Sequence, residues 1–400
     1  MPHYTAVLVR YAELGIKSKR TRRRMQQLLA RNIRLALEES SVEYETVREE
    51  FGRLFVITHD ARRASQVVSR VFGVVSASPV VEISSRLDEI LDVGCQVAEE
   101  VLRPNVSLAV RARRFGNHEY TSQDIRSQLG ARILEVLAHR GLRVDLDCPE
   151  QIVAVEVRDE RAYIYADTDQ GFGGMPTGSQ GKVVCTVSTG LDSPVAAFKV
   201  MKRGCVPVFV YFDNSPYTDS RCRDVAIAQA RRLAGYIYGE EVKMYIIPHG
   251  DDLEDVLHHC PSKMICVMCK RNMLRLAREV AFREGADAIV TGEIIGEQAS
   301  QTTANLRVIS SAVSDYPVLR PCAGDDKSDV ERMAQRIGTY EFAQQSLTCC
   351  TLPPRYPSIQ ADLHRVLECE SEMDLSVIRK ELDRAEILYL RTSAGEPAGA

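Results

Sequence analysis

The sequence predicts an α/β protein in which a doubly wound parallel sheet follows two smaller units of mixed helices and strands. From Lys182 onward, apolar runs of strand length alternate with helical patterns, which is typical of a parallel sheet covered on both faces. A glycine-rich stretch at 171–181 has too few large side chains to pack a core, and it predicts a linker before this sheet. Ahead of the linker, strands and helices fall into two groups.

The first group predicts a ferredoxin-like α+β domain over residues 1–75. Its pattern gives a strand, a long helix with an apolar stripe, two paired strands and a second helix. These elements are expected at 5–11, 18–39, 42–47, 53–57 and 61–72.

The second group predicts a further domain over residues 76–170. A helix, a strand that carries Arg residues at its end, a second helix and a hairpin follow one another. They are expected at 87–102, 107–114, 121–139 and 152–165.

The third domain, 182–390, is expected to hold the parallel sheet, and residues 391–400 have the composition of a disordered tail. Apolar runs predict strands at 183–187, 206–212, 242–247 and 287–291. Helical patterns are expected at 193–202, 218–234, 251–259, 270–284 and about 374–388.

Composition excludes several classes of protein. No apolar run reaches the roughly 18 residues that a membrane span needs, so we expect no membrane association. The first residues lack the apolar stretch of a secretory signal. Twelve cysteines without such a signal indicate a reducing compartment, the cytoplasm, where clustered cysteines are more often metal-binding or catalytic than disulfide-bonded.

Positive charge is concentrated at the start of the chain. Residues 1–35 hold nine Lys or Arg residues and one acidic residue, although the whole chain has a net charge of −4. A basic face on a mildly acidic protein suits a polyanion partner. A solvated helix face explains a basic run equally well.

The strongest local signal is Ser188-Thr189-Gly190-Leu191-Asp192-Ser193-Pro194, which lies between an apolar strand and a helix-forming segment. Such a turn points backbone N–H groups and hydroxyls at one spot beside the positive end of a helix dipole, which suits phosphate. The stretch lacks the Gly-Lys-Ser/Thr of a Walker-type loop. It resembles the Ser-Gly-Gly-X-Asp-Ser loop of the PP-loop ATP pyrophosphatases, with Thr189 in place of the first Gly. An ordinary Ser/Gly turn is the alternative interpretation.

Two other strand ends carry polar or glycine residues. Phe212-Asp213 and Thr291-Gly292-Glu293 each follow a predicted strand. Because ligands of open parallel sheets bind at the carboxyl ends of the strands, these segments and the Ser188 loop are expected to meet at one edge.

The cysteines suggest a second kind of chemistry. Cys266 and Cys269 form a C-x-x-C motif before a predicted helix, whose N-terminus is expected to lower the pKa of a thiol, and Cys349-Cys350 follows far downstream. Three converging thiolates could ligate an iron–sulfur cluster, whereas redox thiols or buried structural cysteines fit the spacing too.

Taken together, the chain resembles the tRNA 4-thiouridine synthetase family, in the form that has C-x-x-C and no rhodanese domain. The similarity runs from about residue 5 to 365, and the second domain resembles a THUMP domain, an RNA-binding module. The segments that carry the resemblance are 8–18, 173–178, 188–194, 290–302, and Cys350 with Pro357.

This resemblance implies adenylation by ATP and Mg²⁺ of the oxygen on carbon 4 of a tRNA uridine near position 8, followed by displacement of AMP by sulfur. Separately from the resemblance, we expect sulfide or a cysteine desulfurase as the sulfur donor and a homodimer as the assembly, and the sequence itself carries no signal for either. The matching ATP-binding positions are Thr186, Val187, Ser188, Gly190, Asp192, Ser193, Tyr211, Phe212, Lys270, Gly292 and Gln301. A cap or magnesium role suits Asp192 better than direct phosphate contact, because like charges repel.

Cys350 matches the family's sulfur-transfer cysteine, and Cys266 and Cys269 with Cys350, or Cys349, are expected to ligate a 4Fe–4S or 3Fe–4S cluster. The RNA-contacting residues are expected to be Lys17, Lys19, Arg22, Arg23, Arg111, Arg113 and Arg114. Two other functions stay open: a PP-loop sulfurtransferase for thiamine or another small acceptor, and a non-catalytic RNA-binding protein with a decayed loop.

Overall fold

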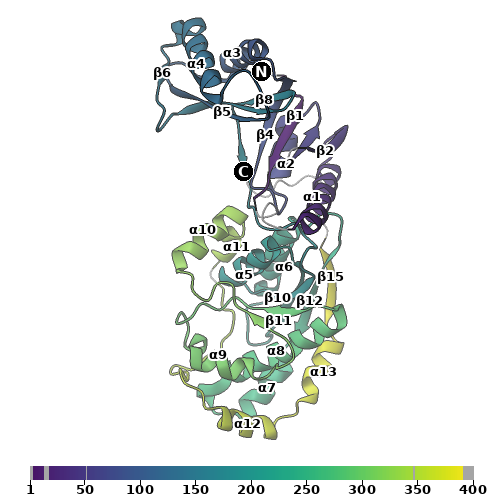
Figure 1. The fold of residues 1–400 in the computed structure, drawn as a ribbon. Helices are drawn as coiled ribbons and strands as arrows, with labels where there is room; N and C mark the ends of the chain where they lie inside the picture. Colours follow the sequence, from purple (N-terminus) through teal and green to yellow (C-terminus); the bar gives the residue numbers. More distant parts are fainter. Residues whose placement is uncertain (1–2, 13–17, 51, 346, 391–400) are drawn as a thin grey trace. The chain divides into compact units, whose positions relative to one another are not determined.

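The computed structural model describes residues 3–12, 18–50, 52–345 and 347–390, and the chain divides into two compact units (Figure 1). The first unit is Met1–Pro176 and the second is Thr177–Ala400. The predicted tail, 391–400, lies outside the described residues. No helix in the described part of the chain is both long enough and apolar enough to cross a bilayer.

One mixed sheet runs through the first unit. Its described strands have the order β2-β3-β1-β4-β8-β7-β5-β6, and β9 also pairs with β4. The strands are β1 (Ala6–Arg10), β2 (Thr46–Glu50), β3 (Arg53–Ile57), β4 (Ser76–Ser84), β5 (Ser107–Phe115), β6 (Arg143–Val144), β7 (Gln151–Arg158), β8 (Arg161–Tyr165) and β9 (Asp169–Gln170). The helices are α1 (Lys19–Glu39), α2 (Ala61–Ser69), α3 (Leu87–Val101) and α4 (Ser122–Val136), with a 3₁₀ turn, η2 (Ala138–Arg140).

Strand β4 belongs to both predicted N-terminal domains. Its first half pairs antiparallel with β1, and its second half pairs antiparallel with β8. Phe55 of β3 and Tyr163 of β8 stack with ring centroids 4.5 Å apart, in a buried cluster that includes Leu8 and Val80. The ferredoxin-like and THUMP parts therefore share a sheet and a stretch of core.

The second unit is the predicted doubly wound sheet, in the order β14-β13-β10-β11-β12-β15. Its strands are β10 (Lys182–Thr186), β11 (Val206–Asp213), β12 (Val242–Pro248), β13 (Ala288–Val290), β14 (Val318–Leu319) and β15 (Glu386–Leu390). Its α-helices are α5 (Asp192–Lys202), α6 (Arg221–Ala234), α7 (Gly250–His259), α8 (Ile265–Glu284), α9 (Thr303–Ser310), α10 (Lys327–Ile337), α11 (Tyr340–Ala343), α12 (Leu363–Glu372) and α13 (Ser376–Asp383). Its 3₁₀ turns are η3 (Ser262–Met264) and η4 (Ala299–Gln301).

The strand order places a topological switch beside β10. The chain runs outward from β10 to β11 and β12 and then returns to β13 on the other side of β10, with β10, β11, β12, β13 and β14 all parallel. The crevice of such a sheet opens at the carboxyl ends of the two strands at the switch. The Ser188 loop follows β10 and the Thr291 segment follows β13, so both predicted segments lie at this crevice.

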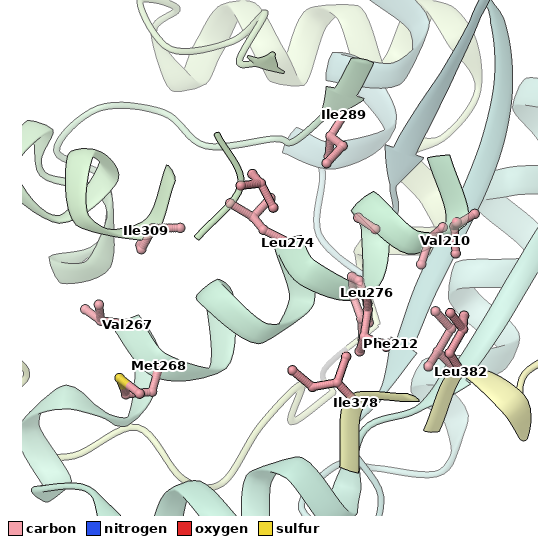
Figure 2. Packing of buried hydrophobic residues seen from close by; sticks show 14 of the residues in the cluster. Val210, Phe212, Val267, Met268, Leu274, Leu276, Ile289, Ile309, Ile378 and Leu382 are labelled. Carbon is pink, nitrogen blue, oxygen red and sulfur yellow. The ribbon is translucent and has the colours of Figure 1, made fainter. Parts of the chain in front are cut away.

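Helix α8 packs against one face of this sheet. Its apolar side packs with β11 and α13 in one buried cluster, in which Phe212, Leu276 and Leu382 lie together (Figure 2). Leu276 is completely buried. Because burial of a large apolar side chain stabilises by roughly 1.5–3 kcal/mol, this cluster fixes α8 against the strands whose ends form the site.

Two predicted elements differ from the structure. Helix α8 begins at Ile265, five residues earlier than expected, so Cys266 and Cys269 lie inside its first turns. The helix expected at about 374–388 ends at Asp383, and β15 then pairs antiparallel with β12. The backbone of β15 pairs with the open edge of β12, and this pairing outweighs the local helical pattern.

Candidate active site

The loop after β10 is closed by its own serines. The Ser188 N–H donates to Ser193 Oγ at 2.9 Å, and the two hydroxyls lie 2.9 Å apart. The Gly190 N–H donates to Ser188 Oγ at 3.3 Å. Ser188 and Gly190 are exposed, whereas Ser193 is buried. Leu191, the N-cap residue of α5, makes no side-chain cap hydrogen bond, so the first N–H groups of the helix keep their capacity for an anion.

Thr189 takes the place of a glycine without backbone strain. It is not among the described residues with positive φ, so a side chain costs nothing at this position. Its hydroxyl forms a hydrogen bond with the Cys349 thiol. The substitution therefore links the loop to the downstream cysteine segment, 160 residues away.

Gly292 allows the segment after β13 to approach the loop. A Cβ atom at Gly292 would lie 2.6 Å from both the Cα and the backbone N of Ser193, closer than real Cβ contacts. The Thr186 hydroxyl donates to the Val290 carbonyl at 3.2 Å and ties β10 to β13 at the same edge. These contacts hold the carboxyl ends of β10 and β13 together at the topological switch point.

Asp192 is paired with a lysine that the sequence pattern does not indicate. Lys327 Nζ lies 3.0 Å from Asp192 Oδ1 and 2.6 Å from Glu297 Oε1. Burial raises the pKa of Asp192, and the Lys327 ammonium opposes this shift. Carboxylate oxygens of Asp192 and Glu297 are ligands that Mg²⁺ accepts, so the donor chemistry fits a magnesium ion.

The other predicted nucleotide contacts surround the same edge. Tyr211 and Phe212 are consecutive buried residues of β11 and point to opposite faces of the sheet. Lys270 Nζ lies 3.6 Å from Glu293 Oε1. Gln301 Oε1 is buried and has no hydrogen-bond partner among the described residues. Such an unsatisfied acceptor is costly and suits a ligand donor.

The C-x-x-C thiols lie three residues apart near the start of α8, and Cys350 is their neighbour in space. Burial raises the pKa of Cys266 to about 11, and the nearby Cys269 and Cys350 thiols add to the shift. Burial also raises the pKa of Cys350, with a contribution from Cys269. The predicted lowering of the thiol pKa at this helix N-terminus is therefore wrong for Cys266, because desolvation outweighs the helix dipole.

The two adjacent cysteines have different neighbours. Cys349 contacts Thr189, and its thiol also lies beside Cys222 of α6. Cys350 interacts with Cys266 and Cys269. This geometry favours Cys350 over Cys349 as the third thiol of the set.

Three neighbouring thiols supply the donor chemistry of an iron–sulfur site. No group of three or more His, Cys, Asp or Glu side chains within the described ranges is already arranged to hold a metal ion. Cys266, Cys269 and Cys350 thus supply donors of the kind that a cluster needs, but their sulfurs are not arranged as a metal site in this structure.

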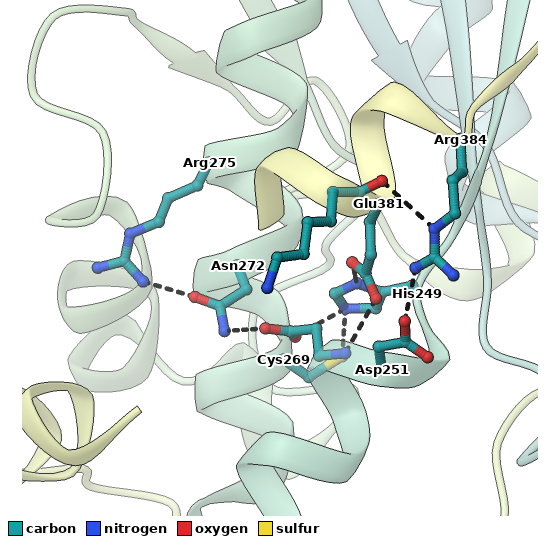
Figure 3. Close-up of polar contacts among 9 residues, drawn as sticks. His249, Asp251, Cys269, Asn272, Arg275, Glu381 and Arg384 are labelled. Carbon is teal, nitrogen blue, oxygen red and sulfur yellow. Dashed lines mark hydrogen bonds and ion pairs between the residues drawn. The ribbon is translucent and has the colours of Figure 1, made fainter. Parts of the chain in front are cut away.

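A buried polar group that no sequence motif indicates lies beside Cys269. His249 follows β12, and its Nε2 lies 3.7 Å from Cys269 Sγ (Figure 3). Its Nδ1 lies 3.1 Å from Glu381 Oε2 of α13. Burial lowers the pKa of His249, but hydrogen bonds to Cys269 and Glu381 and the charge of Asp252 raise it well above its ordinary value. No sequence spacing signals a group assembled from segments 132 residues apart.

In the first unit, the predicted basic residues of α1 line an open depression. It has a volume of about 500 Å³, and its lining includes Lys19 and Arg23 together with Arg20 and Arg24. Arg22 is half-buried beside them, and Lys17 lies outside the described residues. No acidic residue occupies the first turn of α1. Because cations oppose the dipole at a helix N-terminus, helix stability does not explain this charge.

The three arginines of β5 do not share one face. Arg111, Arg113 and Phe115 are exposed on one side, and Arg114 points to the other, since side chains alternate along a strand. Arg114 is tied to the Gly116 carbonyl at 2.8 Å. Arg114 therefore lies on the opposite face of β5 from Arg111 and Arg113.

Three family models match consecutive parts of the chain. The ThiI ferredoxin-like domain matches residues 6–78, the THUMP domain 84–167, and "Thiamine biosynthesis protein (ThiI)" 178–375. A probable tRNA sulfurtransferase of Methanosarcina mazei is 36% identical over 387 residues, which cover 96% of this chain and 95% of the relative. The chain belongs to the tRNA sulfurtransferase family. Another probable tRNA sulfurtransferase, from Moorella thermoacetica, is 36% identical over 396 residues, covering 98% and 99% of the two chains.

A solved structure agrees with this family over nearly the whole chain. A crystal structure of a 4-thiouridine synthetase–RNA complex with bound ATP has a TM-score of 0.84 and 28% sequence identity. The match covers 97% of this tRNA sulfurtransferase family member and all of that chain. The predicted order of ferredoxin-like, THUMP and PP-loop parts is thereby confirmed.

Proposed function

We propose that the protein is an ATP-dependent tRNA sulfurtransferase that converts a tRNA uridine near position 8 to 4-thiouridine in the cytoplasm. One observation carries this proposal: the loop at 188–194, which resembles a pyrophosphate-binding loop, contacts the Cys349-Cys350 segment. The Thr189 hydroxyl bonds to Cys349, and the next residue, Cys350, neighbours the two thiols of α8. A nucleotide site and a sulfur site side by side are what replacement of an oxygen by sulfur requires.

The chain's own residues account for the first step. The N–H groups at the open end of α5, with Ser188, Gly190 and Ser193, hold the pyrophosphate part of ATP. The uridine O4 attacks the α-phosphorus, the bond to the β-phosphate oxygen breaks, and pyrophosphate leaves. Fixed N–H dipoles stabilise the charge that develops on the phosphates. Asp192 and Glu297 are the residues that would hold Mg²⁺, with Lys327 adding positive charge beside them.

The second step replaces a good leaving group. A sulfur nucleophile adds to carbon 4, and AMP leaves with the original uridine oxygen. Cys350, Cys266 and Cys269 hold or deliver the sulfur, and a bound iron–sulfur cluster would supply an iron site for sulfide. Tyr211 and Phe212 flank the adenosine with their backbone at the carboxyl end of β11, since their side chains are buried on opposite faces, and the free acceptor of Gln301 suits the adenine amino group. Lys270 and Gly292 complete the nucleotide contacts.

The basic surfaces favour RNA over a small sulfur acceptor. The α1 depression and the exposed Arg111, Arg113 and Phe115 of β5 offer phosphate contacts and an aromatic ring for a base. A thiamine precursor would need neither surface.

Transfer of an oxygen label from uridine to AMP tests this proposal. Protein purified without oxygen is given ATP, Mg²⁺, sulfide and tRNA that carries ¹⁸O at the uridine O4. We expect 4-thiouridine, one pyrophosphate per product, and ¹⁸O in AMP. Cys350→Ala should lose product, and Cys148→Ala, at an exposed cysteine of the first unit, should retain it. Unlabelled AMP, or ATP turnover without tRNA thiolation, would refute the proposal.

A further inference from the structure

His249 is a polar side chain enclosed in the core beside the thiols. Its side chain has no exposed surface, and it follows β12 at the carboxyl edge of the sheet. The ring lies between Cys269 of α8 and Glu381 of α13 (Figure 3). Buried polar groups of this kind need partners for both ring nitrogens, so the direction of each hydrogen bond can be assigned.

The partner of each nitrogen fixes its role. The Glu381 carboxylate only accepts, so Nδ1 carries a hydrogen and donates across 3.1 Å. Nε2 has two neighbours, Cys269 Sγ at 3.7 Å and Asp252 Oδ2 at 3.3 Å. Only the sulfur contact has hydrogen-bond geometry, and Asp252 Oδ2 has no hydrogen-bond partner among the described residues. Cys269 Sγ is therefore the hydrogen-bond partner of Nε2, and a metal-bound Cys269, which has lost its proton, would accept the Nε2–H.

A network holds the imidazole in this position. Glu381 Oε1 accepts the backbone N–H of Asp252 at 2.9 Å, and Asp252 Oδ1 accepts the Asn272 amide at 2.6 Å. The ring of His249 also packs against Phe212, with centroids 5.7 Å apart. Contacts from α7, α8, α13 and β11 thus hold the His249 ring in one orientation. Within the described part of the chain, no side chain donates a hydrogen bond to the Cys266 thiol.

We propose that His249, anchored by Glu381, is a positioning residue for Cys269: it hydrogen-bonds this sulfur, and not that of Cys266, and would donate an N–H···S hydrogen bond to it when Cys269 ligates a metal. This inference rests on the proposed function for its purpose. An N–H donor stabilises a thiolate and weakens its electron donation to a bound metal. Hydrogen bonds to the sulfurs are among the factors that set the reduction potential of an iron–sulfur cluster. The His249 ring packs against Phe212, a residue of the proposed nucleotide site, so the two sites share this neighbour.

The first measurement needs no iron and no tRNA. In the full-length, iron-free protein, dilute iodoacetamide alkylates Cys269 and Cys266, and mass spectrometry gives the rate at each site. We expect His249→Leu to slow the alkylation of Cys269 by about tenfold, because the thiolate that reacts loses its hydrogen-bond partner. The alkylation rate of Cys266 should be unchanged. Glu381→Gln should give a smaller effect, and His249→Gln, which keeps an N–H donor, should restore much of the rate.

The second measurement uses protein reconstituted with iron and sulfide. We expect a more negative reduction potential in His249→Leu at equal iron content, and a partial return in His249→Gln. His258→Leu, at an exposed site of α7, is the matched control and should match wild type in both measurements. If His249→Leu does not fold, Glu381→Gln and His249→Gln carry the test.

Equal Cys269:Cys266 alkylation ratios in all variants would overturn the inference, as would parallel changes at both thiols with a lower melting temperature. The alkylation result stands even if the wild type makes no 4-thiouridine, so failure of the proposed function is seen separately.

Discussion

Replacing Gly292 with alanine should displace the loop that follows β10, because the new methyl group has no room. The Cβ atom would lie 2.6 Å from Ser193 N and Cα and 2.9 Å from the Asp192 carbonyl carbon. All three are backbone atoms at the start of α5, which cannot rotate away as a side chain can. Relief of such overpacking costs about 1–3 kcal/mol. If that cost falls on the arrangement that binds phosphate, the Kd for ATP should rise roughly 5- to 150-fold.

Calorimetric titration of Mg·ATP into the protein measures this effect. Gly324→Ala is the matched control, since a Cβ there meets no atom within 4 Å and should leave the Kd unchanged. A melting temperature for each variant separates loop displacement from general unfolding. Wild-type ATP affinity in a folded Gly292→Ala variant would show that the loop tolerates the shift and that the phosphate site lies elsewhere.

Leu276→Ala should lower the free energy of unfolding by about 2–5 kcal/mol, because the side chain is fully buried between α8 and the sheet; urea denaturation measures this, and a loss under 1 kcal/mol would contradict it. Glu370→Gln should cost about 3–5 kcal/mol by leaving the buried Arg271 guanidinium unpaired. Burial opposes ionisation of Glu370, but Arg271 holds its pKa below the ordinary 4.5. A lowered folded pKa means that the wild type loses this stabilisation as pH falls below about 4.5, whereas the variant should not. Lys19→Gln with Arg23→Gln should weaken tRNA binding and reduce the slope of log K against log salt by about 0.7–0.9 per lost phosphate contact; an unchanged slope would exclude α1 from the interface.

The parallel sheet was predictable because its strands are buried on both faces. Runs such as Val183-Val184-Cys185 and Val208-Phe209-Val210 are apolar without alternation, and the loops after them carry the polar residues. The strand that follows α13 was not predictable, since its partner, β12, is distant in the sequence. Hydrophobic periodicity reports on one segment at a time. An edge strand such as β15 forms only because another strand, here β12, is available to pair with it.

The candidate site was predictable where a single segment carries the chemistry. Ser188, Ser193 and the C-x-x-C pair stand out by spacing, but Lys327 and His249 do not. Both enter the site by tertiary contact alone, with Asp192 and Cys269 respectively. The roles of Cys349 and Cys350 could not be separated either, because adjacent side chains point to different neighbours only once the backbone is placed.

The strand shared by the two N-terminal domains limits how they can be cut apart. A fragment that begins at residue 84 leaves the β8 edge bare, and a fragment that ends before Ser76 strips the partner from β1. Either fragment exposes an unpaired strand edge, whose backbone N–H and C=O groups can pair with other chains and cause aggregation. Moving the THUMP part onto another enzyme therefore means moving the whole first unit, and we expect its ferredoxin-like and THUMP parts to melt in one calorimetric transition.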